Sequence, residues 1–127
     1  MILIVESGST KANSLLIDGK HQYPVQQTIG LNPFFIKQQD IESAFLSLNL
    51  NADFIFEVYF YGAGCSNEEK CAFIKNALQP LLHKAHIEVH SDLLAAARAT
   101  FKQHDGIVGI LGTGSNAATF MGGEFTN

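Results

Sequence analysis

The fold is decided by residues 1–19, which read MILIVESGSTKANSLLIDG from Met1 to Gly19. Residues 1–6 and 12–17 are two apolar, β-branched-rich runs, and a short polar segment containing Gly8 lies between them. This pattern predicts two strands joined by a tight turn. A third strand is expected over residues 22–29. Because Pro24 has no amide hydrogen, that strand should lie at an edge or contain a bulge.

Helical and strand patterns alternate downstream of these strands. Apolar residues at helical spacing predict a helix capped by Asp40, a second capped by Ser66 or Asn67, and a third begun by Ser91 or Asp92. Strands are expected over residues 54–61, 86–89, 106–111 and 117–121. The order of these elements predicts an α/β fold with a mixed sheet and helices packed on it.

Length and composition exclude several classes of protein. The 127 residues fit one domain, and 46% hydrophobic against 16% charged residues is not the composition of a disordered chain. Eight basic and twelve acidic residues give a net charge of −4, which argues against nucleic acid as a partner. No apolar run reaches the length of a membrane-spanning helix, and the opening run is too short for a signal peptide, so a cytoplasmic location is expected.

The two cysteines form no recognisable chemical motif. Cys65 and Cys71 match neither a CxxC pair nor the spacing of zinc ligands. Cysteine is commonly buried as a small apolar residue. We therefore interpret both as ordinary packing residues.

A glycine turn between two strands occurs twice in the chain. Residues 7–11 form the first and residues 112–116 the second, about 100 residues later, which suggests two related lobes. Glycine allows an anion to approach the backbone, and hydroxyls and amides can donate to phosphate oxygens, with Lys11 adding a positive charge. Plain hairpin turns remain an alternative, because hairpins use the same residues. Ser115 stands where a P-loop needs lysine, and no helix suited to a dinucleotide site follows.

Five short motifs occur along the chain: Glu6-Ser7-Gly8-Ser9-Thr10-Lys11, Gly30-Leu31-Asn32-Pro33, Tyr61-Gly62-Ala63-Gly64, His90-Ser91-Asp92 and Leu111-Gly112-Thr113-Gly114-Ser115-Asn116. Together they resemble the N-acetylglucosamine kinase and BadF/BadG/BcrA/BcrD ATPase family, within the sugar kinase, heat-shock protein and actin superfamily. The resemblance spans the whole chain. It implies a ribonuclease-H-like mixed five-stranded sheet with flanking helices over residues 1–104. Residues 105–127 would be the opening hairpin of an incomplete second lobe, which makes the chain a fragment.

The resemblance also implies site residues, with ATP and Mg²⁺ as cofactors. The ATP phosphates would lie against Gly8, Ser9, Thr10 and Lys11 from one lobe and Thr113 and Gly114 from the other. The sugar would lie near Asn32, Gly62, Ala63, Gly64, Asp92, Ser115 and Asn116. Asp92 matches the family's general base, which takes the proton from the attacking sugar hydroxyl.

Four positions have competing interpretations. The family normally has Asp where this chain has Glu6, and the extra methylene leaves magnesium handling there open, because magnesium demands near-ideal octahedral geometry. Asp92 could serve as a helix cap as well as a base. Phe34 and Phe35 are expected to cover the core rather than form a sugar platform.

The leading functional expectation is an ATP-dependent sugar kinase acting on N-acetylglucosamine or a related amino sugar, with the 127-residue chain inactive by itself. The alternatives are an ATPase of the same superfamily that activates a partner enzyme, and a non-catalytic sugar-binding module. The apolar strands within residues 106–121 offer an exposed edge, so self-association through this terminal hairpin is a further expectation.

Overall fold

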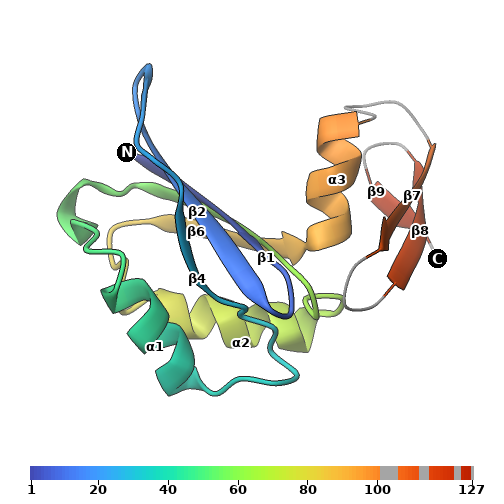
Figure 1. Ribbon diagram of the computed structural model, residues 1–127, viewed down its shortest axis with the longest axis horizontal. Helices are drawn as coiled ribbons and strands as arrows, with labels where there is room; N and C mark the ends of the chain where they lie inside the picture. Colours follow the sequence, from blue (N-terminus) through green and yellow to red (C-terminus); the bar gives the residue numbers. More distant parts are fainter. Residues whose placement is uncertain (101–105, 112–114, 122–123, 127) are drawn as a thin grey trace.

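The computed structural model (Figure 1) describes residues 1–100, 106–111, 115–121 and 124–126, with side chains through residue 98. Along the chain the elements are β1 (Ile2–Ser7), β2 (Lys11–Asp18), β3 (His21–Gln22), β4 (Gln26–Ile29), α1 (Gln38–Leu46), a 3₁₀ turn (Ala52–Phe54), β5 (Glu57–Gly62), α2 (Glu68–Leu78), β6 (His86–Ser91), α3 (Asp92–Thr100), β7 (Gly106–Leu111), β8 (Ser115–Met121) and β9 (Glu124–Thr126).

The main sheet is mixed, as the sequence predicts. Its strand order is β3-β2-β1-β5-β6, and β4 also pairs with β2. β1 runs antiparallel to β2 and parallel to β5, and β6 runs parallel to β5. The expected third strand is split around Pro24 into β3 and β4, so six short strands replace the expected five.

Helices cover both faces of this sheet. α1 and α2 lie together on one face, and α3 lies on the other (Figure 1). In β1, Leu3, Val5 and Ser7 are buried on the side of α1 and α2, while Glu6 is exposed on the opposite side. The main core therefore lies between the sheet and the first two helices.

Local hydrogen bonds explain where two helices begin. The Asn67 side chain accepts from the Lys70 amide at 2.9 Å, which confirms Asn67 as the cap of α2. The expectation for Asp40 is wrong, because α1 begins earlier, at Gln38. The Asp40 carboxylate instead accepts from the Lys37 amide at 2.8 Å from within the first turn.

A second, antiparallel sheet follows α3, in the order β7-β8-β9. The sequence predicts the hairpin β7-β8 but not β9. α3 contacts both β7 and β8, so this helix lies between the two sheets (Figure 1). Self-association through the hairpin stays a prediction. Among the described residues, no helix has the length and apolar character needed to cross a membrane.

Candidate functional site

The ends of three parallel strands lie in line at one edge of the main sheet. Ser7, the last residue of β1, pairs with Gly62 of β5, and Gly62 pairs with Ser91 of β6. In open α/β sheets, ligands bind in the crevice beyond the carboxyl ends of the strands. The register therefore brings the glycine turn, the 62–64 loop and Asp92 to the same edge.

Ser7 joins two loops to the end of β1. Its side chain is 0% exposed, and its hydroxyl oxygen accepts from the Leu31 amide at 2.8 Å. Its carbonyl accepts from the Ala63 amide at 2.7 Å. Hydrogen bonds to a fully buried residue are costly to break, because the freed polar groups cannot reach water. Ser7 thus fixes the positions of the 30–33 and 62–64 loops.

The first glycine turn is supported from one side and open on the other. The Gly8 amide donates to the Lys11 carbonyl at 2.9 Å, and the Gly30 amide donates to the Thr10 carbonyl at 3.0 Å. A Cβ on Gly30 would overlap the Ser9 carbonyl group. A Cβ on Gly8 would make only ordinary contact, at 3.5 Å from the Lys11 carbonyl oxygen. Gly30 is therefore required for packing, whereas Gly8 leaves a free approach to the turn.

Asn32 connects the turn to the other loops. Its side-chain nitrogen donates to the Ser9 hydroxyl oxygen at 3.0 Å, and its side-chain oxygen accepts from the Phe34 amide at 3.0 Å. The residue is only 6% exposed. Gly64 has a positive φ of 81°, and a Cβ there would overlap the Asn32 side-chain oxygen. Asn32 thus packs between the first glycine turn and the Gly64 loop.

Asp92 begins α3 without capping it. The Ser91 hydroxyl oxygen accepts from the Leu93 amide at 3.2 Å, which is the contact of a cap residue. The Ser91 hydroxyl also approaches the Asp92 carboxylate at 3.4 Å. The cap role therefore falls to Ser91. The half-buried Asp92 carboxylate makes no hydrogen bond to a backbone amide within the described residues.

An open depression lies beside Ser91, the residue that precedes Asp92. It has a volume of about 370 Å³ and lies between the start of α2 and the end of β6. Ser66, Glu68, His90 and Ser91 are among its lining residues. The carboxyl edge of the sheet therefore carries a hollow of the size range in which small ligands bind.

Phe34 and Phe35 do not cover the core, contrary to expectation. They are 57% and 77% exposed. The Lys70 ammonium lies 4.4 Å from the centre of the Phe34 ring, a cation–π contact. The Asn32–Phe34 hydrogen bond turns the chain outward at this point, so the pair lies on the surface beside the candidate site.

The remaining predicted residues are placed as follows. Lys11 begins β2 and is exposed, and Glu6 is exposed on the sheet face opposite α1 and α2. Ser115 and Asn116 begin β8, where they pair with Leu111 and Ile110. Thr113 and Gly114 lie outside the described residues. Direct contacts thus connect Ser9, Asn32 and the 62–64 loop, and the strand register brings Asp92 to the same edge. The contribution of the second turn stays a prediction.

Two supporting residues were not singled out in the sequence. Ser7 follows Leu3 and Val5 at the alternation of a strand, which would have indicated an inward-facing hydroxyl. Gly30 was noted as part of a motif, but the close approach that requires it joins positions far apart in the chain. The alternation of the strand can therefore reveal Ser7, whereas only the folded structure reveals the role of Gly30.

The strand order and the placement of the helices define the class of fold. The main unit is a ribonuclease-H-like mixed sheet with flanking helices, of the kind found in actin-like kinases. The chain is 39% identical, with a TM-score of 0.88, to a Porphyromonas gingivalis protein provisionally named an N-acetylglucosamine kinase. This match covers 99% of the present chain and 46% of the Porphyromonas protein, so the chain spans about half of its relative's length.

Weaker similarities extend to two other solved structures. YeaZ from Pseudomonas aeruginosa is 15% identical, with a TM-score of 0.47, over 98% of this chain and 61% of that one. The PPX-GPPA enzyme from Aquifex aeolicus is 12% identical, with a TM-score of 0.46, over 99% of this chain and 50% of that enzyme. No family model and no curated protein matches the chain.

Proposed function

We propose that this chain is the substrate-side lobe of an ATP-dependent kinase of the N-acetylglucosamine kinase and BadF/BadG/BcrA/BcrD ATPase family. Its substrate would be N-acetylglucosamine or a related amino sugar. The observation that carries the proposal is the alignment of Ser7, Gly62 and Ser91 at one sheet edge. The proposal is supported by this register because the hydroxyl-rich turn follows Ser7 and Asp92 follows Ser91, at the same edge of the sheet.

The turn has the properties of a phosphate-binding segment. Ser9 and Thr10 bring hydroxyls, Lys11 brings a positive charge, and the open side of Gly8 admits an anion close to the backbone. Phosphoryl transfer depends largely on positioning and on neutralising the charge of the phosphates. The hydrogen bonds of Gly30 and Asn32 hold the turn in place, so little ordering would be required on binding.

Asp92 would act as the general base. Because Ser91 caps α3, the Asp92 carboxylate is available to accept the proton of a sugar hydroxyl. The 62–64 loop, held by the Ser7 carbonyl, would form the neighbouring wall of the sugar site. Asn32 would support that wall and offer its remaining hydrogen-bonding capacity to the sugar.

A single exposed carboxylate, that of Glu6, is compatible with a magnesium ion bound mainly through phosphate. Mg²⁺ is usually held by one or two carboxylates together with substrate phosphates and water. The described residues contain no group of three or more acidic, histidine or cysteine side chains that could enclose a metal. Glu6 would hold the ion through water. The bound ion would neutralise phosphate charge.

The division into lobes is part of the proposal. Residues 1–104 would form the first lobe, and residues 105–127 would begin the second, with Thr113 and Gly114 approaching the phosphates. A kinase must enclose both substrates to exclude water. The 127 residues alone should therefore bind ligands without supporting turnover.

Nuclear magnetic resonance titration of the chain tests this assignment. N-acetylglucosamine should shift the amides around Asn32, Gly64 and Leu93, and ATP with Mg²⁺ should shift those of Gly8 to Lys11. Asp92→Asn should weaken sugar binding at least fivefold and leave ATP binding unchanged. The matched control is Asp53→Asn, because Asp53 pairs with His83 and Lys84 away from this edge.

The outcomes separate the alternatives. Nucleotide shifts without any sugar response would favour an ATPase that activates a partner enzyme. Sugar binding without any nucleotide response would favour a non-catalytic module. Steady N-acetylglucosamine-dependent ADP release by the chain alone would contradict the division into lobes.

A further inference from the structure

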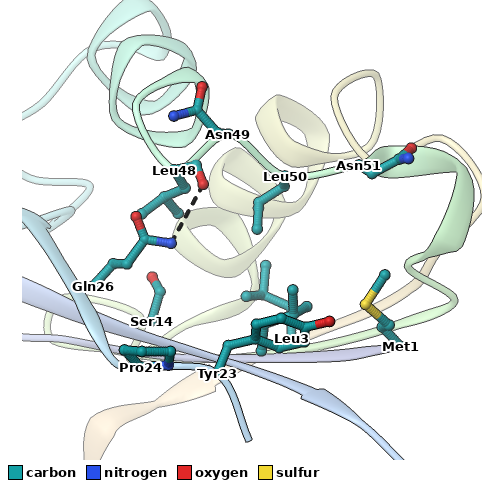
Figure 2. Close-up of a pocket in the computed structure, with 11 residues that line it drawn as sticks. Met1, Leu3, Ser14, Tyr23, Pro24, Gln26, Leu48, Asn49, Leu50 and Asn51 are labelled. Carbon is teal, nitrogen blue, oxygen red and sulfur yellow. Dashed lines mark hydrogen bonds between the residues drawn. The ribbon is translucent and has the colours of Figure 1, made fainter.

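A second cavity lies away from the carboxyl edge of the sheet. It has a volume of about 250 Å³ and lies between the β1-β2 end of the sheet and the segment after α1 (Figure 2). Leu3 at its floor is four residues from Ser7, or about 13 Å along the strand. None of its lining residues belongs to the candidate site described above.

Pro24 explains why the cavity exists. β4 pairs with β2 from Ser14 to Lys11, and β3 pairs with Asp18 and Ile17. The Tyr23 amide still donates to the Leu16 carbonyl at 3.0 Å, so the chain leaves the ladder at Pro24. Tyr23 and Pro24 both line the cavity. The segment from Leu48 to Asn51 forms the opposite wall (Figure 2). The cavity is thus built by a break in strand pairing rather than by loosely packed loops.

The lining is mainly apolar and carries no charged side chain. Leu3, Leu16, Leu48 and Leu50 provide aliphatic surface, and Tyr23 provides an aromatic ring. No carboxylate, ammonium, guanidinium or imidazole side chain occurs among the eleven residues that line it, all of which the structure describes. The amino group of Met1 is engaged by the Phe54 carbonyl at 2.6 Å. An ion would gain nothing here to offset its loss of water.

One buried polar group points into this apolar space. Ser14 is 5% exposed, and its hydroxyl is directed into the cavity (Figure 2). The described residues provide no hydrogen-bond partner for this hydroxyl. The side-chain nitrogen of the nearby Gln26 donates to the Leu48 carbonyl at 3.4 Å. No fully buried side-chain nitrogen or oxygen of the described residues lacks a partner, so the Ser14 hydroxyl keeps its exposure towards the cavity, where a bound molecule can pair with it.

We propose that this cavity is a binding site for a small uncharged molecule with an apolar ring and one hydroxyl group that pairs with Ser14. A cavity of about 150 Å³ lined by apolar residues already binds benzene, so the size is sufficient for a single substituted ring. The site is independent of the proposed kinase function and lies on the opposite end of β1.

Titration of the ¹⁵N-labelled chain with phenol tests the proposal, with toluene and benzoate as comparison probes. Phenol should produce saturable shifts at Ser14, Leu16 and Leu50, and none at Ser9 or Asn32. Toluene should bind at least threefold more weakly than phenol because it lacks the hydroxyl. Benzoate should produce no shifts at these positions because its charge would be buried.

Two variants of Ser14 and one control complete the design. Ser14→Ala should reduce phenol affinity to that of toluene and leave toluene affinity unchanged. Ser14→Leu should fill the cavity and abolish the binding of both phenol and toluene. Ser43→Ala removes an exposed serine of α1 and should change neither the phenol affinity nor the toluene affinity. If Ser14→Leu does not fold, Ser14→Ala still decides the question. Absence of saturable phenol shifts, shifts outside the cavity, or equal phenol affinity in Ser14→Ala and the unaltered chain would overturn the proposal.

Discussion

The side-chain nitrogen of Asn32 donates to the hydroxyl oxygen of Ser9 across 3.0 Å, joining two loops that are 23 residues apart in the chain. The same side chain accepts from the Phe34 amide and packs against Gly64. One buried amide therefore holds the glycine turn against the loop that would form the sugar site.

Replacing Asn32 should destabilise the chain. Asn32→Ala removes both hydrogen bonds and leaves the Phe34 amide without its acceptor, so we expect a loss of about 2 kcal/mol in the free energy of unfolding. Asn32→Asp keeps an acceptor for Phe34 and can accept from the Ser9 hydroxyl, so its loss should be smaller. Urea unfolding measures both, with Asn76→Ala on the exposed side of α2 as the control. Equal losses for the two Asn32 variants would contradict the bridging role.

Two glycines of the site should respond differently to alanine. Gly30→Ala places a methyl group against the Ser9 carbonyl, so the turn must shift, and we expect a loss of about 2 kcal/mol or more. Gly8→Ala meets ordinary contacts, so its stability should stay within about 0.5 kcal/mol of the unaltered chain.

The methyl group in Gly8→Ala should instead block the approach of a phosphate and lower ATP affinity at least tenfold. Urea unfolding measures the stability of the Gly30→Ala and Gly8→Ala variants, and nucleotide titration measures their ATP affinity. A stable Gly8→Ala variant with undiminished ATP affinity would show that the turn is not the phosphate site.

Glu88 should contribute stability that depends on pH. Its carboxylate lies 3.0 Å from the His90 imidazole, and that hydrogen bond lowers the Glu88 pKa from its ordinary value of 4.5. A group with a lowered pKa stabilises the fold above its unfolded pKa, and this stability is lost as the pH falls through the folded value. Because the side chain is 36% exposed, we expect only about 0.5 kcal/mol.

Unfolding of Glu88→Gln between pH 3 and 6 measures this contribution. The variant should be less stable than the unaltered chain near pH 6, and the difference should disappear towards pH 3. Glu42→Gln is the control, because the Glu42 carboxylate contacts the uncharged Gln38 amide. A stability difference between Glu88→Gln and the unaltered chain that grows as the pH falls would contradict this prediction.

Cys65 should be almost inert to thiol reagents. Burial raises the pKa of its thiol from 9.0 to about 12, which reduces the thiolate fraction near pH 8 by about a thousandfold. The less buried Cys71 should react first with iodoacetamide, and both should react at similar rates in concentrated urea. Mass spectrometry of Cys65→Ser and Cys71→Ser variants identifies the modified residue. Faster modification of Cys65 than Cys71 in the folded chain would contradict its place in the core.

The sequence predicts the fold better than it predicts the details of the site. The β1-β2 hairpin and the cap at Asn67 follow from local patterns, because neighbouring residues determine them. The outward placement of Phe34 could not be predicted in this way, since it depends on a hydrogen bond to Asn32 and on Lys70 of α2. Composition suggests that two adjacent phenylalanines are buried, but the path of the backbone places them on the surface.

The cap of α3 shows the same limit at the proposed base. Ser91 and Asp92 are both suitable caps, and the sequence does not distinguish them. The hydroxyl of Ser91 takes the role because Ser91 is the last residue of a parallel strand, paired with Gly62. The availability of the Asp92 carboxylate thus follows from strand pairing.

The pairing of Ser7 with Gly62 and of Gly62 with Ser91 has a consequence for how specificity could change. Adjacent strands lie about 4.8 Å apart, so the backbone ladder holds the first and third strand ends roughly 10 Å from each other. β5 lies between these two ends, so substitutions in the loops can alter the chemical groups presented at this edge but not the distance between the strand ends. A change in what this edge recognises would therefore come from the side chains of the loops rather than from the spacing of the strands.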